Sequence, residues 1–190
     1  MLKDLILKNR SYRRFFQDEK ISKVQLRDWV DLARNSASAR NSQSMKFILS
    51  TDDSLNAEIY GQLAWAGYLT TWKGPEEGER PSAYIILLND TLISGNYFCD
   101  DGIAMQSILL GATEAGFGGC IIHSVNRSKL RAILNLSEQY EILYVIALGK
   151  PKETVVLEEM QEGDVKYWRD EKEVHHVPKR ALDEIILEEK

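Results

Sequence analysis

Apolar residues spaced three or four positions apart predict several helices along this chain. Ser22 and Gln25 have the spacing of a capping box, and the apolar residues behind them predict a helix over about 22–34. The same spacing predicts further helices over 2–6, 55–66, 101–115, 130–134 and 182–186. The stretch 101–115 is apolar around nearly its whole circumference, so we expect it to be buried in a core or a subunit interface.

Shorter apolar runs predict strands between these helices. They cover 46–50, 83–88, a strand that begins at Cys120, and 140–148. Residues 35–43 and 74–81 are rich in small, polar and turn-forming residues, and they predict loops. Helices and strands alternate, and only about four strands are clear, so we expect a layered α+β domain rather than an all-helical or all-β one.

The length and composition predict one folded unit with a polar extension. At 190 residues and 44% hydrophobic, the chain can bury one ordinary core, so we expect a single domain over 1–190. After Gly149–Pro151 the sequence becomes charged, and residues 151–190 lack a core pattern of their own. We therefore expect this C-terminal extension to wrap another surface, such as that of a second subunit.

Charge and cysteine content argue against several classes of protein. A formal net charge of -5 and a pI near 5.3 disfavour a general nucleic-acid binder. Cys99 and Cys120 have neither close spacing nor a histidine cluster nearby, which disfavours a disulfide framework or a zinc site. His175 and His176 are expected to be polar residues of the tail rather than metal ligands, because no third ligand is evident. With no signal peptide and no membrane-spanning apolar run, we expect a soluble, cytoplasmic protein that does not bind a membrane.

Several polar segments could together hold one ligand that has a phosphate, a polyol and a flat hydrogen-bonding ring. Arginine presents a rigid fork of donors that matches phosphate and planar carbonyl groups. Small residues let the backbone approach a ring, and amide donors at a strand end can meet its acceptors. The candidates are Arg10, Ser11 and Arg13, the loop 38–43, the glycine turn 116–119 leading to His123 and Ser124, and Lys179 with Arg180.

These segments resemble, in order, the motifs of the nitroreductase family of flavin mononucleotide (FMN) enzymes. Arg10–Phe15 resembles the family's R-S-x-R-x-F opening, and Ala37–Gln43 resembles its P-S-A-x-N-x-Q loop. Residues 101–112, followed by the glycine turn, resemble its central helix. Residues 146–151 resemble its last strand ending in G-x-P, and 178–180 stand in the place of its C-terminal basic pair. The likeness covers most of the chain.

The resemblance implies an α+β sandwich with a mainly antiparallel central sheet flanked by helices. It also implies an intertwined homodimer with two FMN molecules at the subunit interface. Arg10, Ser11 and Arg13 would hold the phosphate and the pyrimidine side of the flavin, and Lys179 and Arg180 would complete the phosphate site. The other residues implied are Ser38, Ala39, Asn41 and Gln43 from the second subunit, and the backbone at Ile122, His123 and Ser124 near the flavin N5 edge.

The implied function is transfer of two electrons from NADH or NADPH to an electron-poor acceptor, such as a nitroaromatic compound or a quinone, by a ping-pong mechanism. The flavin carries the chemistry, so neither a protein nucleophile nor a metal ion is required. Two alternatives keep the fold: other flavin chemistry, such as reductive dehalogenation or oxygen-dependent reactions, or flavin binding without turnover. No G-x-G-x-x-G unit is present, so a separate dinucleotide-binding domain is not expected.

The sequence leaves the natural acceptor and the preferred nicotinamide donor open. His123 is evenly balanced between a structural residue at a strand end and a contact to the flavin edge. Trp65, Tyr68 and Trp72 could line an acceptor pocket, although packing is the commoner role of such residues.

Overall fold

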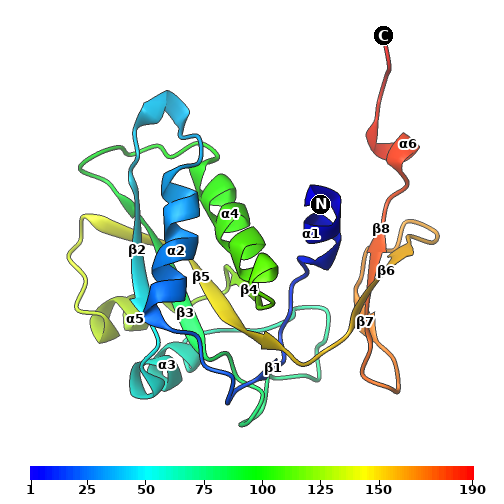
Figure 1. Ribbon diagram of the computed structural model, residues 1–190, viewed down its shortest axis with the longest axis horizontal. Coiled ribbons are helices and arrows are strands. Elements are labelled where there is room, and N and C mark those ends of the chain that lie inside the picture. Colours follow the sequence, from blue (N-terminus) through cyan, green and yellow to red (C-terminus); the bar gives the residue numbers. More distant parts are fainter.

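The computed structural model describes residues 1–190 and has a five-stranded central sheet, shown in Figure 1. Its strands are β1 (Phe15–Phe16), β2 (Met45–Ser50), β3 (Ala83–Asp90), β4 (Gly118–Ile122) and β5 (Tyr140–Pro151). β5 pairs with β1, β3 and β4, and β2 pairs with the far side of β3. All four pairings are antiparallel, which confirms the predicted α+β class with a mainly antiparallel sheet.

Helices cover both faces of this sheet: α2 (Lys23–Arg34) and α4 (Asp100–Glu114) lie on one face, and α3 (Asp53–Tyr60) and α5 (Arg127–Ile133) lie on the other (Figure 1). Helix α1 (Leu2–Lys8) packs beside α4, and α6 (Leu182–Ile185) belongs to the C-terminal extension, away from the sheet. Alternate side chains of β3 point to opposite faces, so Ile85 and Leu87 join one apolar cluster while Tyr84 and Ile86 join another. Residues of α2 and α4 complete the first cluster, and residues of α3 and α5 complete the second. None of these helices combines the length and the apolar content needed to cross a membrane.

The capping box predicted before α2 is present. The Ser22 Oγ accepts a hydrogen bond from the backbone N–H of Gln25 at 3.2 Å, and the Gln25 side chain accepts one from the backbone N–H of Ser22 at 3.0 Å. Two donors that the helix itself cannot satisfy are thereby paired. Leu26 and Trp29 on the inner face of α2 are buried.

The helix predicted over 55–66 is wrong at its end, because α3 stops at Tyr60. Leu63 forms an isolated antiparallel bridge with Val125, just beyond β4. Ala66 has a φ of 40°, which lies outside the helical region. The apolar spacing of Leu63 and Ala66 therefore reflects packing of an extended segment beside β4, and not a continuation of the helix.

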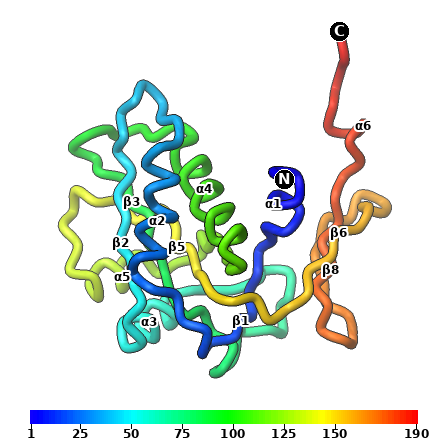
Figure 2. Tube along the Cα trace, in the orientation of Figure 1, coloured from blue at the N-terminus to red at the C-terminus, as the bar shows by residue number.

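The C-terminal extension forms a small sheet of its own, which the sequence did not predict. Its strands are β6 (Val155–Glu159), β7 (Trp168–Arg169) and β8 (His175–Lys179). They lie in the order β6-β8-β7, with β6 parallel and β7 antiparallel to β8. Figure 2 shows this sheet beside the central one, with the chain continuing past α6 to a C-terminus that points away from it. The wrapping of a second subunit by this segment stays a prediction.

Candidate functional site

The segment that carries the arginines, between α1 and β1, lies against the start of β4. Ser11 forms a parallel bridge with Gly119, and the backbone N–H of Tyr12 donates to the Gly119 carbonyl oxygen at 3.0 Å. A Cβ atom on Gly118 would lie 2.5 Å from Cδ2 of Tyr12, and one on Gly119 would lie 2.5 Å from the carbonyl oxygen of Ala147. The glycine turn predicted from the sequence therefore allows a close approach of backbones, in addition to ending α4.

Four of the predicted site residues, Arg10, Ser11, Arg13 and Lys179, line one cavity of about 330 Å³. It lies between the end of α1, α4, β4 and the tail sheet. The complete lining is Asn9, Arg10, Ser11, Arg13, Gln106, Leu109, Ile121, Val155, Tyr167, His175, Val177 and Lys179. It contains three cationic side chains and no acidic one, so its charge favours an anionic ligand.

Arg10 and Arg13 keep donors that the protein does not satisfy. Arg10 Nη2 donates to the carbonyl oxygen of Ile6 at 2.7 Å, but its buried Nε has no partner. Arg13 Nη1 donates to the carbonyl oxygen of Ser11 and to Nε2 of His175, both at 3.2 Å. A guanidinium group has five N–H donors, and a buried donor without a partner is costly unless a ligand pairs with it. The donor set thus fits a phosphate group.

His175 forms the floor beneath Arg13 and is buried. Because a guanidinium only donates, His175 Nε2 accepts the bond from Arg13, and the ring proton lies on Nδ1. Burial lowers the pKa of His175 to about 4, and the charges of Arg13 and Arg169 act in the same direction. The ring of Tyr167 lies 5.2 Å from the His175 ring and 4.8 Å from the Arg13 guanidinium carbon. The imidazole is therefore neutral near pH 7.

A second cavity, of about 230 Å³, adjoins the first and shares Arg13, Ile121 and Tyr167 with it. Its other lining residues are Ala64, Trp65, Ala66, Gly67, Cys120, Ile122, His123 and Ser124. The fold thus places the predicted residues at the end of β4 next to the arginine-lined cavity. The His123 side chain is exposed, and its ring lies 5.4 Å from that of Tyr144.

The three aromatic residues left open by the sequence have different positions. Trp65 lines the second cavity and is largely buried. Tyr68 packs on Tyr167 with ring centroids 4.9 Å apart, at the same end of the molecule. Trp72 lies outside both cavities, where the Arg169 guanidinium covers its ring at 4.3 Å. Of the three, Trp65 is the one positioned to face a ligand directly.

The loop predicted to reach the flavin from another subunit lies apart from the arginines in this chain. Ser38, Asn41 and Gln43 line a third cavity, of about 250 Å³, between α2, α4 and β2. This loop lies at the N-terminal end of α4, where Asp100 binds it, whereas the arginine-lined cavity is walled by Gln106 and Leu109 from the middle of α4. Arg180 is also absent from the arginine-lined cavity, because it pairs with Glu184. A single chain therefore brings together only part of the predicted site.

A buried carboxylate, that of Asp100 at the start of α4, holds this loop in place. Its two oxygens accept hydrogen bonds from Ser38 Oγ at 2.6 Å and from the backbone N–H of Ala39 at 2.8 Å. Ser38 Oγ in turn accepts a bond from the backbone N–H of Gln43 at 3.0 Å. Asn41 and Gln43 adopt left-handed φ values of 54° and 52°, which persist only where surrounding contacts fix them.

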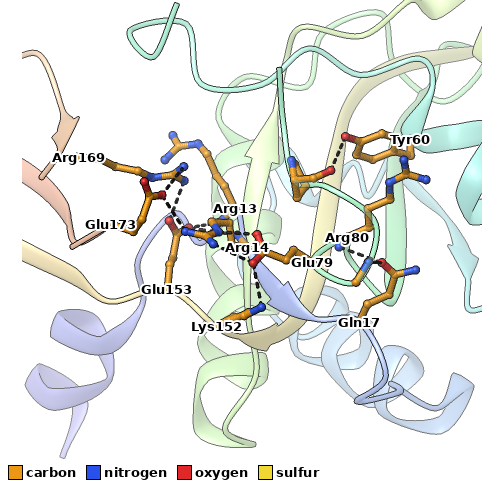
Figure 3. A network of polar contacts seen from close by, with 12 residues as sticks. Arg13, Arg14, Gln17, Tyr60, Glu79, Arg80, Lys152, Glu153, Arg169 and Glu173 are labelled. Carbon is orange, nitrogen blue, oxygen red and sulfur yellow. Dashed lines mark hydrogen bonds and ion pairs between the residues drawn. The ribbon is translucent and has the colours of Figure 1, made fainter. Parts of the chain in front are cut away.

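Arg14 follows Arg13 in the chain but points away from the cavity, into the ion-pair network of Figure 3. Its Nε and Nη2 donate to the two carboxylate oxygens of Glu79 at 2.5 and 2.8 Å, and Lys152 Nζ donates to the same carboxylate at 2.8 Å. The hydrogen bonds from Arg14, followed by those from Lys152, lower the pKa of Glu79 to about 2. Arg14 therefore holds segments of the fold together, whereas Arg13 faces the cavity.

Two buried carboxylates that organise these segments, those of Asp100 and Glu153, are not among the site residues predicted from the sequence. Glu153 accepts hydrogen bonds from the backbone N–H groups of Arg13 and Arg14. A lone acidic residue leaves no periodic pattern, so the only available signal was the position of Glu153 two residues after the predicted G-K-P strand end.

Comparison with known proteins gives a consistent result. The model of the family described as "Nitroreductase family" matches residues 97–150, which include α4, β4 and most of β5. YodC of Bacillus subtilis (strain 168), a protein assigned as an NAD(P)H nitroreductase, is 25% identical over 177 residues, which cover 77% of this chain and 88% of YodC. The matched helix, glycine turn and strand are among the elements that carry the motif resemblance.

Solved structures share the fold. A nitroreductase family protein from Clostridium novyi NT matches with a TM-score of 0.67 and 25% identity, over 80% of this chain and 87% of its own. The NADPH:FMN oxidoreductase of Vibrio harveyi, solved in complex with NAD+, matches with a TM-score of 0.62 and 22% identity, over 79% of this chain and 68% of its own. The family match, the relative and the shared fold confirm the resemblance of this chain to the nitroreductase family.

Proposed function

We propose that this protein is an FMN-dependent oxidoreductase that moves two electrons from NADH or NADPH to an electron-poor acceptor, such as a nitroaromatic compound or a quinone, in a ping-pong cycle. The observation that carries the proposal is the cavity that gathers Arg10, Arg13 and Lys179 without an acidic residue, beside the strand end at His123. The relatives assigned as an NAD(P)H nitroreductase and as an NADPH:FMN oxidoreductase support it.

The residues of the two adjoining cavities have separable roles in this proposal. Arg10 and Lys179 hold the phosphate, which gives the unpartnered Nε of Arg10 an acceptor. Bound FMN supplies the capacity to accept a hydride and to pass on two electrons. The charge of Arg13 would stabilise negative charge that develops on the cofactor. The second cavity, with Trp65 on its wall, would receive the flat ring system of the cofactor and the substrate.

We propose in addition that a second copy of the chain completes the site. Within one chain the loop around Asn41 lines a different cavity from Arg13, and a symmetric partner could offer its own loop to the arginine-lined cavity. Apolar side chains that nothing covers are typical of an interface. They are Leu2, Ile6 and Leu7 on α1, and Leu182, Ile185 and Leu187 near the C-terminus. In such a dimer Lys179, which lines the arginine cavity, and the neighbouring Arg180 would lie close to the partner.

An anaerobic titration of the flavin-loaded protein with NADH and with NADPH, followed by visible absorption, tests the reaction. Rapid bleaching by one donor, with reoxidation by a quinone, is the expected result and identifies the preferred donor. A protein that binds flavin but stays yellow would refute the NAD(P)H reaction and favour other flavin chemistry or flavin binding without turnover.

Replacing Arg10 and Arg13 together by Ala tests the cofactor site. Flavin should be lost while the far-ultraviolet circular dichroism stays native. The matched control removes the same two charges from the exposed side of α2, by Lys23→Ala with Arg27→Ala, and should retain flavin. Full flavin content in the cavity variant would refute the assignment of this site.

Mixed dimers test whether two chains share each site. Chains with Arg13→Ala and chains with Asn41→Ala should each bind flavin weakly as homodimers. A mixed dimer contains one site that carries both substitutions and one site that carries neither, so half of the binding capacity should return. No recovery of flavin in a purified mixed dimer would refute a shared site.

A further inference from the structure

Glu153 lies buried where the arginine segment meets the tail sheet (Figure 3). Its side chain is 0% exposed. One carboxylate oxygen accepts hydrogen bonds from the backbone N–H groups of Arg13 and, at 3.2 Å, of Arg14. The other oxygen accepts a bond from Arg169 Nη2 at 2.9 Å. Three donors from two separate parts of the chain thus converge on one carboxylate.

The two backbone bonds fix the direction of the arginine segment. Consecutive side chains of an extended segment point to opposite sides, and here Arg13 enters the cavity while Arg14 pairs with Glu79 on the other side. Glu153 holds the peptide groups of both residues, so it sets the orientation on which this divergence depends. A buried carboxylate with charge-assisted bonds is a strong anchor, and its loss leaves the amide donors without partners.

The third bond ties the tail sheet to the same point. Arg169 belongs to β7, and its side chain is only 9% exposed because it packs over Trp72. In the sheet Arg169 pairs with His175 on β8, and β8 ends at Lys179. His175 contacts Arg13, and Lys179 lines the cavity. The bond between Glu153 and Arg169 therefore helps to fix the position of the tail sheet, together with the contacts of His175 and of Trp72.

We propose that Glu153 is a positioning residue for the cofactor site: through its bonds to the backbone of Arg13 and Arg14 it directs the Arg13 side chain into the cavity, and through Arg169 it places the strand that brings Lys179 to the same cavity. This inference rests on the proposed function, since it names the residue that prepares the site for the flavin phosphate. Glu153 does not line the cavity itself, so it acts through Arg13 and Lys179.

Glu173 is the matched control. It contacts Arg14 at 2.9 Å and Arg169 at 3.9 Å, so it shares two of the same partners and carries the same charge. Its side chain is 61% exposed, and it accepts no bond from the backbone of the arginine segment. Exposed ion pairs contribute little, so Glu173→Gln should leave the cavity as it is.

The test uses the full-length protein and two readouts. The first is the equilibrium dissociation constant of FMN, measured by quenching of flavin fluorescence. The second is hydrogen exchange of the backbone amides of residues 13 and 14 in the flavin-free protein. Glu153→Ala should weaken FMN binding about tenfold or more and accelerate exchange at both amides. Glu153→Gln keeps one carbonyl oxygen for the amides, so it should restore their protection and give an intermediate dissociation constant. Glu173→Gln should match the wild type in both readouts.

Other results would overturn the inference. If Glu153→Ala binds FMN as the wild type does, or if Glu173→Gln weakens binding equally, Glu153 does not position the site. If Glu153→Ala fails to fold, the decision passes to Glu153→Gln and Arg169→Gln, and wild-type binding by both would overturn the proposal. A wild-type protein that does not bind FMN would refute the proposed function itself, whereas unaffected variants of a flavin-binding wild type refute only the role of Glu153.

Discussion

Replacing Asp100 by Ala should destabilise the protein well beyond an ordinary change at a helix end. The carboxylate is only 4% exposed and accepts bonds from Ser38 Oγ and from the backbone N–H of Ala39. Bonds to a charged group contribute about 1.5–3 kcal/mol each, and an acid in the first turn of a helix adds about 0.3–1 kcal/mol. Since the loop can relax toward water after the change, we expect the free energy of unfolding to fall by about 3–4 kcal/mol.

Asp101→Ala is the matched control for this experiment. Asp101 also lies in the first turn of α4, but its carboxylate accepts only the backbone N–H of the next residue, Gly102, at 2.7 Å. Its removal eliminates the same charge beside the same helix dipole and should cost about 0.5–1.5 kcal/mol. The difference between the two variants, about 1.5–3.5 kcal/mol, isolates the contribution of the contacts to the Ser38 loop.

Urea denaturation followed by circular dichroism, at one protein concentration, measures both variants. In a chain of this length each kcal/mol corresponds to about 2–4 °C, so the melting temperature of Asp100→Ala should fall by roughly 6–16 °C. Ser38→Ala should cost little more in the Asp100→Ala background, with a coupling energy of about 1 kcal/mol or more. A difference below about 1 kcal/mol between the variants at positions 100 and 101 would refute the reasoning.

Three further predictions concern pH dependence and glycine positions. Arg14 holds the pKa of Glu79 at about 2, below its usual 4.5. The ionised Glu79 carboxylate therefore contributes its full stabilisation of the folded state above pH 4.5, and this contribution is lost as the pH falls toward 2. Glu79→Gln should therefore weaken the dependence of the free energy of unfolding on pH below 4.5. An unchanged dependence would contradict the assignment of this effect to Glu79. Burial lowers the pKa of His175 from 6.5 to about 4, so stability should fall between pH 6.5 and pH 4; His175→Gln should remove that slope in urea titrations. Gly119→Ala should destabilise the protein strongly, because its Cβ would lie 2.5 Å from a carbonyl oxygen of β5. Gly102→Ala places its Cβ in open space within α4, so it should stabilise the protein by up to about 1 kcal/mol in thermal melts. Similar effects of the two substitutions would contradict the close approach at Gly119.

Most of the central fold was predictable because its helices and strands form from residues that are close together in the sequence. The capping box at Ser22 predicted the start of a helix and the apolar run 140–148 predicted a strand, and both predictions are confirmed. The end of α3 was missed because a bridge between Leu63 and Val125, which is a long-range contact, overrides helical spacing. The tail sheet was missed because its strands have at most five residues, their apolar positions do not alternate regularly, and one strand has only two residues.

The site was predictable in part for a similar reason. Arg10, Arg13 and Lys179 belong to segments whose composition is unusual, and the fold brings these three together. The carboxylates of Asp100 and Glu153 act through backbone groups far away in sequence, so nothing near either residue indicates its role. The placement of the Asn41 loop and the arginines in different cavities depends on how the segments pack around α4, which motif order does not contain.

The position of β5 in the sheet has a consequence for the synthesis of this chain. β2 and β3 are complete once Asp90 has been made, but β5, which pairs with three other strands, begins only at Tyr140. Until then β3 presents an apolar strand edge, and the two apolar clusters on its faces lack their β5 residues. A nascent or truncated chain that ends before Tyr140 therefore offers a surface suited to chaperones and to aggregation, and productive folding waits for about three quarters of the 190 residues.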